Sequence, residues 1–391
     1  MIRVVLMTDF TESYANKLIK GMARYSFERS PMVMCKMPLS VYVSGGIEKV
    51  VEFAVRWKAD AIIGQFDEKD DLDIFRKNGI IAIAQDNRKR FDSVANITAD
   101  YSAQGREAAR YLITQGARNF GFYGLAGMVW SDERREGFIS EIAGTLDGAI
   151  VSVIERSGTD EIWWYDLEKV RAWLRSLPKP VAILACDDNM AFHIIEACNQ
   201  MEEHGLRIPD DVMLLGMDDD ESLCQLCSPT LSSFKPMIEH AGYCVAKQLD
   251  DRMHLPMEKR FSEFSDIRVM PGSIVTRRST DIFFHENPYI KKVCDYIQHH
   301  YTESVKVDEL VALVPMSRRL LEKLFISEMK VSIHQFIIRL RIDRMIALMT
   351  KGHTPQEAAD LMNMDSKALS RSFKVVMGKT PADYIRTMEK I

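Results

Sequence analysis

Four aspartates each stand at the end of a short apolar run of the kind that forms a buried β-strand. They are Asp9, Asp86, Asp187 and Asp218. An ionised carboxylate accepts charge-assisted hydrogen bonds, so carboxylates around one crevice suit a ligand rich in hydroxyl donors, such as a sugar, and repel an anion. The alternative for each aspartate is that it caps the N-terminus of the following helix. Four together favour a polar binding cleft.

The elements that must position these carboxylates follow from an alternation of apolar runs and helical patterns. Strands are expected at residues 4–7, 32–34, 61–63, 80–84, 120–123, 150–154, 181–185 and 212–215. Such continuous β-branched runs are typical of parallel strands covered by helices on both faces. One series ends near Asp100 and a second begins there, which predicts an α/β fold of two lobes with doubly wound parallel sheets. Open sheets of this kind bind ligands at the carboxyl ends of their strands.

This region resembles the periplasmic-binding-protein-like sensor domain of LacI/GalR regulators. The resemblance is carried by DERREGF at residues 132–138, DDNMAF at 187–192, GLRIPDDV at 205–212, GMDD at 216–219 and SPTLSS at 228–233. It implies that Arg134, Asp187 and Asp218 bind sugar hydroxyls, with Asp86 as a weaker fourth candidate. Trp130 either stacks on a sugar ring or belongs to the wall or core. Asp187 stands where many members of the family have asparagine.

The C-terminal hundred residues show helical periodicity and an internal repeat with an offset of 48 residues. In each copy a short helix, a turn and a capping residue (Ser317 or Asp365) precede a second helix, which is helix-turn-helix spacing. The polar faces of the two second helices, with the first cap, supply the candidate DNA contacts: Ser317, Arg318, Arg319, Glu322, Lys323, Ser366, Lys367, Ser370, Arg371 and Lys374. These donors and acceptors suit base edges and phosphates, although any one charged residue can equally belong to a solvated face.

A helix is expected between the two copies, over residues 333–349. At ~1.5 Å per residue it would be about 25 Å long and would hold the two reading helices at a fixed separation. If that separation is near one DNA turn, about 34 Å, both helices can enter successive major grooves.

The tail resembles the DNA-binding domain of AraC-family transcription regulators. The carriers are MSRRLLEKLF at residues 316–325, RLRIDR at 339–344, LSRSFK at 369–374 and GKTPADY at 378–384. Asn363 and Met364 replace the usual Gly-Phe of the second turn, and because asparagine tolerates left-handed backbone geometry we expect the turn to survive. A LacI-type sensor ahead of an AraC-type tail is the arrangement of the regulators of bacterial xylose operons, which this sequence resembles from end to end.

These resemblances imply a transcription regulator, an activator, that responds to a monosaccharide such as xylose or another pentose. The expected domains are a sensor at residues 1–278, a linker at 279–288 and a DNA-binding domain at 289–391. The expected partners are double-stranded operator DNA, the sugar, RNA polymerase and a second copy of the chain, with no cofactor.

Composition agrees with this division. The chain has 391 residues, 47% of them apolar, and a net charge of −5. Residues 286–391 hold 17 Lys and Arg against 13 Asp and Glu, whereas the remainder holds 34 against 43, so the end expected to meet phosphates is the basic one. No apolar run approaches the ~18 residues of a membrane span and no signal pattern is present, which predicts a cytoplasmic protein. The seven scattered cysteines are expected to be reduced.

Three other classes of protein compete with this interpretation. A carbohydrate-acting enzyme could use the same carboxylates as acid and base, but the sequence has no nucleophile elbow, phosphate-binding Gly-rich loop or metal-spaced cluster. Cys224 and Cys227 form a single pair without a second, which argues against zinc. A solute-binding protein would need export. A sugar-binding module without a DNA role would leave the repeated tail unexplained. We therefore expect no catalytic residues and no metal.

Overall fold

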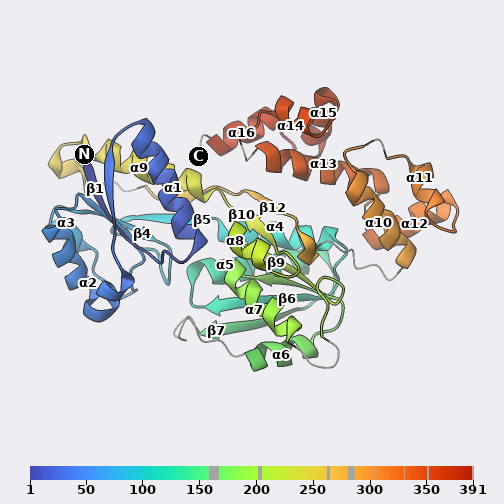
Figure 1. Ribbon diagram of the computed structural model, residues 1–391, viewed down its shortest axis with the longest axis horizontal. Coiled ribbons are helices and arrows are strands. Elements are labelled where there is room, and N and C mark those ends of the chain that lie inside the picture. The colour runs from blue at the N-terminus through green and yellow to red at the C-terminus, as the bar shows by residue number, and fades with distance from the viewer. Residues whose placement is uncertain are drawn as a thin grey trace. The chain divides into compact units, whose positions relative to one another are not determined.

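The computed structural model describes residues 1–157, 167–200, 205–261, 265–280, 287–303, 305–329, 331–349 and 352–389 (Figure 1). The chain divides into two compact units. Unit 1 comprises residues 1–101, 125–133 and 236–271, and unit 2 comprises residues 102–124, 134–235 and 272–391. No helix of the described ranges is long and apolar enough to cross a membrane.

Unit 1 is built on a six-stranded parallel sheet with the order β11-β5-β4-β3-β1-β2. Its strands are β1 (Ile2–Met7), β2 (Met32–Lys36), β3 (Ala61–Gly64), β4 (Ile81–Gln85), β5 (Ala95–Ala99) and β11 (Ile267–Val269). Because successive side chains of a strand point to opposite faces, β1 feeds two cores. Val4 and Leu6 enter one core, and Val5 and Met7 enter the other.

Helices cover both faces of this sheet. One face carries α1 (Ser13–Glu28) and α9 (Ile238–Met253), and the other carries α2 (Leu39–Arg56) and α3 (Asp73–Lys77). The helices α1 and α9 cross closely, with a glycine of each helix at the crossing. A Cβ on Gly21 of α1 would lie 1.8 Å from the carbonyl oxygen of Glu239 on α9. Only a residue without a side chain allows this approach.

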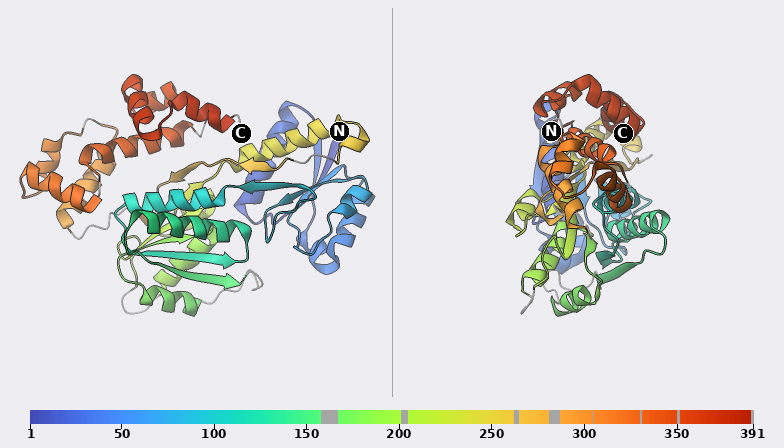
Figure 2. Two further views of the ribbon diagram at one scale, coloured as in Figure 1. Left: turned by 180° about the vertical axis from the view of Figure 1, so that it is seen from behind. Right: turned by 90° about the vertical axis from the view of Figure 1, so that its right-hand side faces the viewer.

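Unit 2 contains the second six-stranded sheet, with the order β12-β10-β9-β8-β6-β7. Its strands are β6 (Phe120–Ala126), β7 (Val151–Ser157), β8 (Val181–Ala185), β9 (Val212–Met217), β10 (Ser232–Lys235) and β12 (Ser273–Val275), of which β12 runs antiparallel to β10. The accompanying helices are α4 (Tyr101–Thr114), α5 (Val129–Thr145), α6 (Leu167–Ser176), α7 (Asp188–Asn199) and α8 (Glu221–Leu226). Figure 2 shows helices on both sides of these strands.

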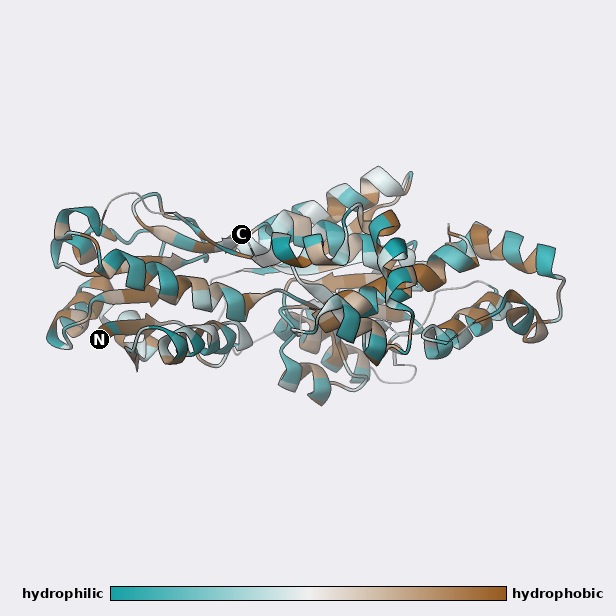
Figure 3. Ribbon diagram, turned by 90° about the horizontal axis from the view of Figure 1, so that it is seen from above, coloured by the Kyte–Doolittle hydropathy of each residue, from teal (hydrophilic) through white to brown (hydrophobic). Residues whose placement is uncertain are grey.

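The C-terminal part is all helical and repeats itself. Its helices are α10 (Pro288–His300), α11 (Val307–Ala312), α12 (Arg318–Met329), α13 (Ile333–Met349), α14 (Pro355–Leu361), α15 (Ser366–Met377) and α16 (Pro381–Glu389). The starts of α11 and α14, and those of α12 and α15, are 48 residues apart, as the repeat predicts. Hydrophilic and hydrophobic residues are mixed along the helices of the molecule (Figure 3).

Two apolar clusters hold these helices, one for each copy of the repeat. The first contains Leu321 and Phe325, the second contains Leu369 and Phe373, and α13 contributes to both. The predicted fold class, two α/β lobes with parallel sheets followed by an all-α region, is confirmed.

The structure differs from the sequence-based expectation in several places. The strands β5, β10, β11 and β12 were not predicted. Helix α2 begins at Leu39 rather than near Ile47, with a break at Gly46, whose φ is +65°. The packed body also continues through Thr280, two residues past its expected end, because Ser279 and Thr280 are fully buried.

Candidate functional site

Arg134 is the best-anchored of the predicted ligand-binding residues. It is 2% exposed, and its guanidinium donates from Nε to Gln104 Oε1 at 3.1 Å and from Nη1 to the Cys186 carbonyl oxygen at 2.7 Å. Its position follows from the glycine three residues later: α5 crosses α4 so closely that a Cβ on Gly137 would lie 2.0 Å from the Ser102 carbonyl oxygen. The close crossing of the two helices fixes the backbone at Arg134, and the hydrogen bonds orient its guanidinium.

Asp218 meets this guanidinium. Arg134 Nη2 lies 2.8 Å from Asp218 Oδ1, and the two side chains are 3% and 18% exposed. Asp218 follows β9 directly and has a φ of +88°, a left-handed conformation that is uncommon for a residue with a side chain. Its backbone N–H donates to the Phe234 carbonyl oxygen at 2.8 Å, which fixes the turn against β10.

Asp187 is the third residue of this group and also the cap of α7. Its Oδ1 accepts from the Met190 backbone N–H at 2.6 Å, so the capping alternative is correct for this aspartate. Burial raises the pKa of Asp187 to about 6, opposed by the hydrogen bond from Met190, and the charge of Asp218 raises it further. The Asp187 Oδ1 is therefore committed to the start of α7.

Unit 1 holds the fourth predicted aspartate in a network of its own. Asp86 Oδ2 accepts from Thr98 Oγ1 at 2.6 Å and from Arg90 Nε at 3.1 Å, while Arg90 pairs with both oxygens of Glu133. Asp86 Oδ1 is buried and has no hydrogen-bond partner among the described residues. Burial raises the pKa of Asp86 to about 6, against the opposing effects of Thr98 and Arg90. A buried acceptor of this kind requires a donor from water or a ligand.

Trp130 and Asp9 have other surroundings. Trp130, near the start of α5, is half-buried and packs against the core shared by α1 and α9, which supports its alternative assignment to the wall. Asp9 accepts from the backbone and the hydroxyl of Thr11, at 2.8 and 2.6 Å, in a local turn.

Sequence reasoning missed the residues that support the predicted ones. Gln104 and Arg90 belong to none of the motifs, and nothing in their spacing distinguishes them from solvated helix or loop residues. Only Glu133 carried a usable signal, because it directly precedes Arg134 in the motif that was recognised.

The first candidate reading helix, α12, begins after Ser317, whose hydroxyl accepts from the Leu320 backbone N–H at 3.4 Å. Arg319 and Lys323 are exposed. Arg318 is exposed too, but it lies 3.0 Å from Glu322 and 3.5 Å from Asp308. The charge of Arg318 is therefore partly neutralised by Glu322 of the same helix and by Asp308 of α11.

The second reading helix, α15, has no acidic residue. It begins after Asp365, whose Oδ1 accepts from the Ala368 backbone N–H at 2.7 Å. Lys367, Arg371 and Lys374 are exposed, and Ser366 and Ser370 are half-buried on the same helix. Asn363 in the preceding turn has a φ of +52°, which confirms that asparagine takes the left-handed position there.

Cys224 and Cys227 are both buried. Cys224 Sγ lies 3.6 Å from Asp188 Oδ2, and no group of three potential metal ligands occurs within the described ranges.

Comparisons with known proteins cover both the body of the chain and its C-terminal part. Residues 109–280 match the family model of the periplasmic binding protein-like domain. The xylose operon regulatory protein of Escherichia coli K12 is 25% identical over 359 residues, which is 89% of this chain and 87% of that protein. The protein of the same name from Haemophilus influenzae is 24% identical over 88% of this chain and 87% of its own length.

Solved structures show the same fold. The structure of the xylose-binding transcription activator XylR aligns with a TM-score of 0.57 at 24% identity, over 98% of this chain and 97% of that one. A LacI family regulator from Enterococcus faecium with bound ribose aligns with a TM-score of 0.56 at 19% identity, over 71% of this chain and 98% of its own. The chain is thus similar to the xylose operon regulatory proteins over 89% of its length, and residues 109–280 match the periplasmic binding protein-like domain.

Proposed function

We propose that this protein is a sugar-responsive, sequence-specific transcription regulator whose effector is D-xylose or another pentose. The observation that carries the proposal is the presence, in one chain, of the buried Arg134–Asp218 pair beside Asp187 and of the doubled helix pairs α11–α12 and α14–α15. The similarity to xylose operon regulators extends over both parts. We propose no catalytic activity, since these relatives are named as regulators.

The ligand chemistry follows from the charges. Arg134 offers donors, while Asp218 and Asp187 offer acceptors, so a neutral polyol can satisfy both kinds of group at once. An anionic sugar would have to approach two carboxylates. We assign Asp86 the same acceptor role because its Oδ1 is buried and lacks a partner within the described residues. For Trp130 we propose a supporting role in the wall.

For the C-terminal helices we propose the DNA-binding mode of the AraC family. α12 and α15 would enter successive major grooves and α13 would set their separation. We further propose that the protein works as an activator in the cytoplasm, contacts RNA polymerase and binds its operator as a homodimer. The domains we propose are the sensor, the short linker and the DNA-binding domain expected from the sequence, with the sensor extended to Thr280.

Calorimetric titration of the full-length protein with D-xylose tests the sensor half. We expect a saturable heat for the wild-type protein and at least a tenfold weaker affinity for Arg134→Ala, because the variant removes the donors that Arg134 offers to the sugar. Arg110→Ala is the matched control. Arg110 pairs with Glu141 through two hydrogen bonds, at 2.8 and 2.9 Å, and the variant should bind D-xylose as the wild-type protein does. Absence of heat with every pentose and hexose at millimolar concentration would refute the sensor.

Selection of duplexes from a random library tests the DNA half. Replacing Arg318 with alanine should weaken binding to the selected duplex by about 1–3 kcal/mol and relax the preference at one base pair, if this side chain reads a base edge. An unchanged base preference would place Arg318 outside the reading face. Failure to select any duplex over random competitor at physiological salt would reject the DNA-binding function as a whole.

A further inference from the structure

Two neighbouring carboxylates at the end of β9 have different partners. Asp218 pairs with Arg134 in the candidate sugar site, whereas Asp219 pairs with Arg277 and Lys235. Both aspartates have left-handed backbones, with φ of +88° and +48°. The Asp219 backbone N–H donates to Ser233 Oγ at 2.9 Å, and the Asp218 N–H is held by Phe234 of the same strand. The turn is therefore fixed at both residues, and it directs successive side chains to separate partners.

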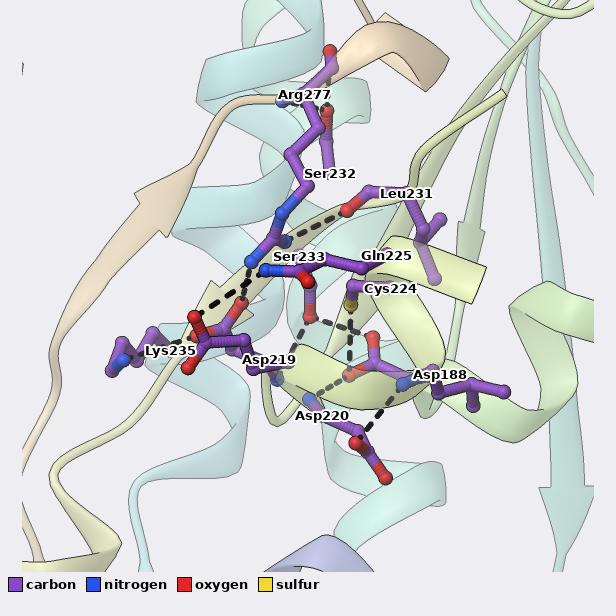
Figure 4. A network of polar contacts seen from close by, with 12 residues as sticks. Asp188, Asp219, Asp220, Cys224, Gln225, Leu231, Ser232, Ser233, Lys235 and Arg277 are labelled. Atoms are coloured by element: carbon purple, nitrogen blue, oxygen red, sulfur yellow. Dashed lines mark hydrogen bonds and ion pairs between the residues drawn. The ribbon is translucent and has the colours of Figure 1, made fainter. Parts of the chain in front are cut away.

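The pair of Asp219 and Arg277 is buried and specific. Asp219 is 2% exposed, and Arg277 Nη2 lies 2.7 Å from its Oδ1. Arg277 Nη1 donates to the Leu231 carbonyl oxygen at 2.8 Å, and Lys235 Nζ lies 3.1 Å from the other oxygen of Asp219 (Figure 4). A guanidinium held through two of its nitrogens cannot shift without breaking one of these hydrogen bonds.

Arg277 opens the segment through which the chain leaves the sensor. Ser232 Oγ lies 2.6 Å from Thr280 Oγ1, Ser279 Oγ donates to the Leu214 carbonyl oxygen at 2.6 Å, and Tyr111 reaches Thr280 at 2.8 Å. The segment 277–280 is thus bonded to β9, β10 and α4. Asn287 is the next described residue and caps α10, the first helix of the C-terminal part.

We infer that Asp219 and Arg277 act as a positioning pair that couples occupancy of the sugar site at Asp218 to the exit segment 277–280, and through it to the DNA-binding helices. The inference rests on the proposed function. A sugar hydroxyl that bonds to Asp218 competes with Arg134 for the same carboxylate. Because Asp219 is the other residue of the two-residue turn, it must adjust when Asp218 adjusts. Packed interiors change between discrete arrangements rather than deform continuously, so a small adjustment at Asp219 moves the segment that Arg277 holds.

The alternative is that the pair stabilises the fold and nothing more. The two roles differ in what a variant changes. A purely structural pair alters the free energy of unfolding and leaves the effect of sugar on DNA affinity intact. A coupling pair alters that effect, while the affinity for sugar itself stays near the wild-type value because Arg134, Asp187 and Asp218 are untouched.

The test uses full-length protein, D-xylose as the sugar and the duplex that the wild type selects from a random library. The measured quantity is the coupling ratio, which is the duplex Kd without sugar divided by the Kd at saturating sugar, inverted if sugar weakens binding. Effector couplings are typically 5- to 150-fold. We expect Asp219→Asn and the neutral double variant Asp219→Asn with Arg277→Met to reduce the ratio to below twofold, with the D-xylose Kd changed by less than threefold. Arg277→Lys keeps the positive charge but lacks the two guanidinium nitrogens that bond Asp219 and Leu231. It should retain an intermediate coupling ratio.

A control variant removes a different ion pair of the same unit. Arg110→Met with Glu141→Gln deletes the pair between α4 and α5 and should keep the wild-type ratio. Thermal unfolding identifies single variants that fail to fold, in which case the double variant and Arg277→Lys decide. A wild-type ratio in folded Arg277→Lys and in the folded double variant overturns the inference, as does a D-xylose Kd raised more than tenfold. A wild-type protein that neither binds D-xylose nor selects a duplex refutes the proposed function itself.

Discussion

Asp187 has a carboxyl group whose protonation must matter for a hydroxyl-rich ligand. Its pKa is raised to about 6, mainly by burial, so at pH 5 only about one-tenth of the group is ionised. A protonated carboxyl has lost most of its strength as an acceptor, and the proton therefore competes with the sugar. We expect the affinity for D-xylose to fall when the pH is lowered from 7.5 to 5.0. In Asp187→Asn this fold-loss of affinity should be smaller than in the wild type by about a factor of ten.

The comparison is made by calorimetry at both pH values. Asp187→Asn keeps an acceptor at this position, so the variant should still bind at pH 7.5. Glu141→Gln is the control, because this carboxylate pairs with Arg110 and not with Arg134. This variant should lose affinity at low pH to the same extent as the wild type. An acid loss that is equally large in Asp187→Asn would mean that Asp187 does not contact the sugar in its ionised form.

Single residues also show the limit of sequence reasoning. The resemblance to LacI/GalR sensor domains nominated Arg134, Asp187 and Asp218, and the structure places these three side chains in one polar group. Arg90 and Arg277 were not found, because the partner of an isolated arginine is decided by which strands become neighbours. That information lies in the tertiary structure and leaves no periodic signal in the chain.

The two candidate reading helices, α12 and α15, differ in charge, and the difference is a property of the whole helix rather than of one residue. The exposed bases of α15 have no acid on their own helix, whereas Arg318 of α12 is paired with Glu322 and Asp308. Contacts with phosphates release counterions, so each one steepens the salt dependence of DNA binding. We expect Lys374→Gln to lower affinity for all duplexes alike and to reduce the slope of log Kd against log salt by about 0.9.

The matched control is Lys247→Gln on α9, where the lysine is paired with Asp251 at 2.6 Å. This variant should leave the slope at its wild-type value. Fluorescence anisotropy between 50 and 200 mM salt measures the slope, and an unchanged slope in Lys374→Gln would remove this lysine from the phosphate contacts.

Prediction of whole elements succeeded where a period or a repeat existed. The duplicated helix pairs appeared in the structure with the expected offset, because each copy must bury the same apolar positions. Strand β5 was missed: its sequence, ANITA, contains Asn96, whose polar side chain is buried and satisfied by Phe91 and Asp266. An asparagine inside a short run argues against a strand until its distant partner is known. Helix α2 was started too late because two glycines interrupt its pattern.

At the scale of the molecule, the boundary of the sensor is a testable quantity. Fragment 1–280 keeps Arg277, Ser279 and Thr280, whereas fragment 1–276 loses all three. We expect fragment 1–280 to bind D-xylose as the full-length protein does. Fragment 1–276 should be less stable by about 3 kcal/mol or more, since Asp219 would lose its buried arginine and Ser232 its partners.

Urea unfolding of the two fragments measures this difference. Equal free energies of unfolding would show that segment 277–280 contributes nothing to the stability of the sensor. The sensor domain would then end before residue 277. Loss of D-xylose binding in a folded 1–280 fragment would show that the C-terminal helices complete the sugar site.

The order in which strands join the two sheets has a consequence for synthesis. β11 pairs with β5 across a separation of 170 residues in the chain, Ile267 against Ile97, and β12 joins the second sheet directly afterwards. A ribosome must therefore make more than two-thirds of the polypeptide before either sheet has its last strand. Until then the nascent chain exposes two open edges together, which makes the growing sensor a natural client for chaperones.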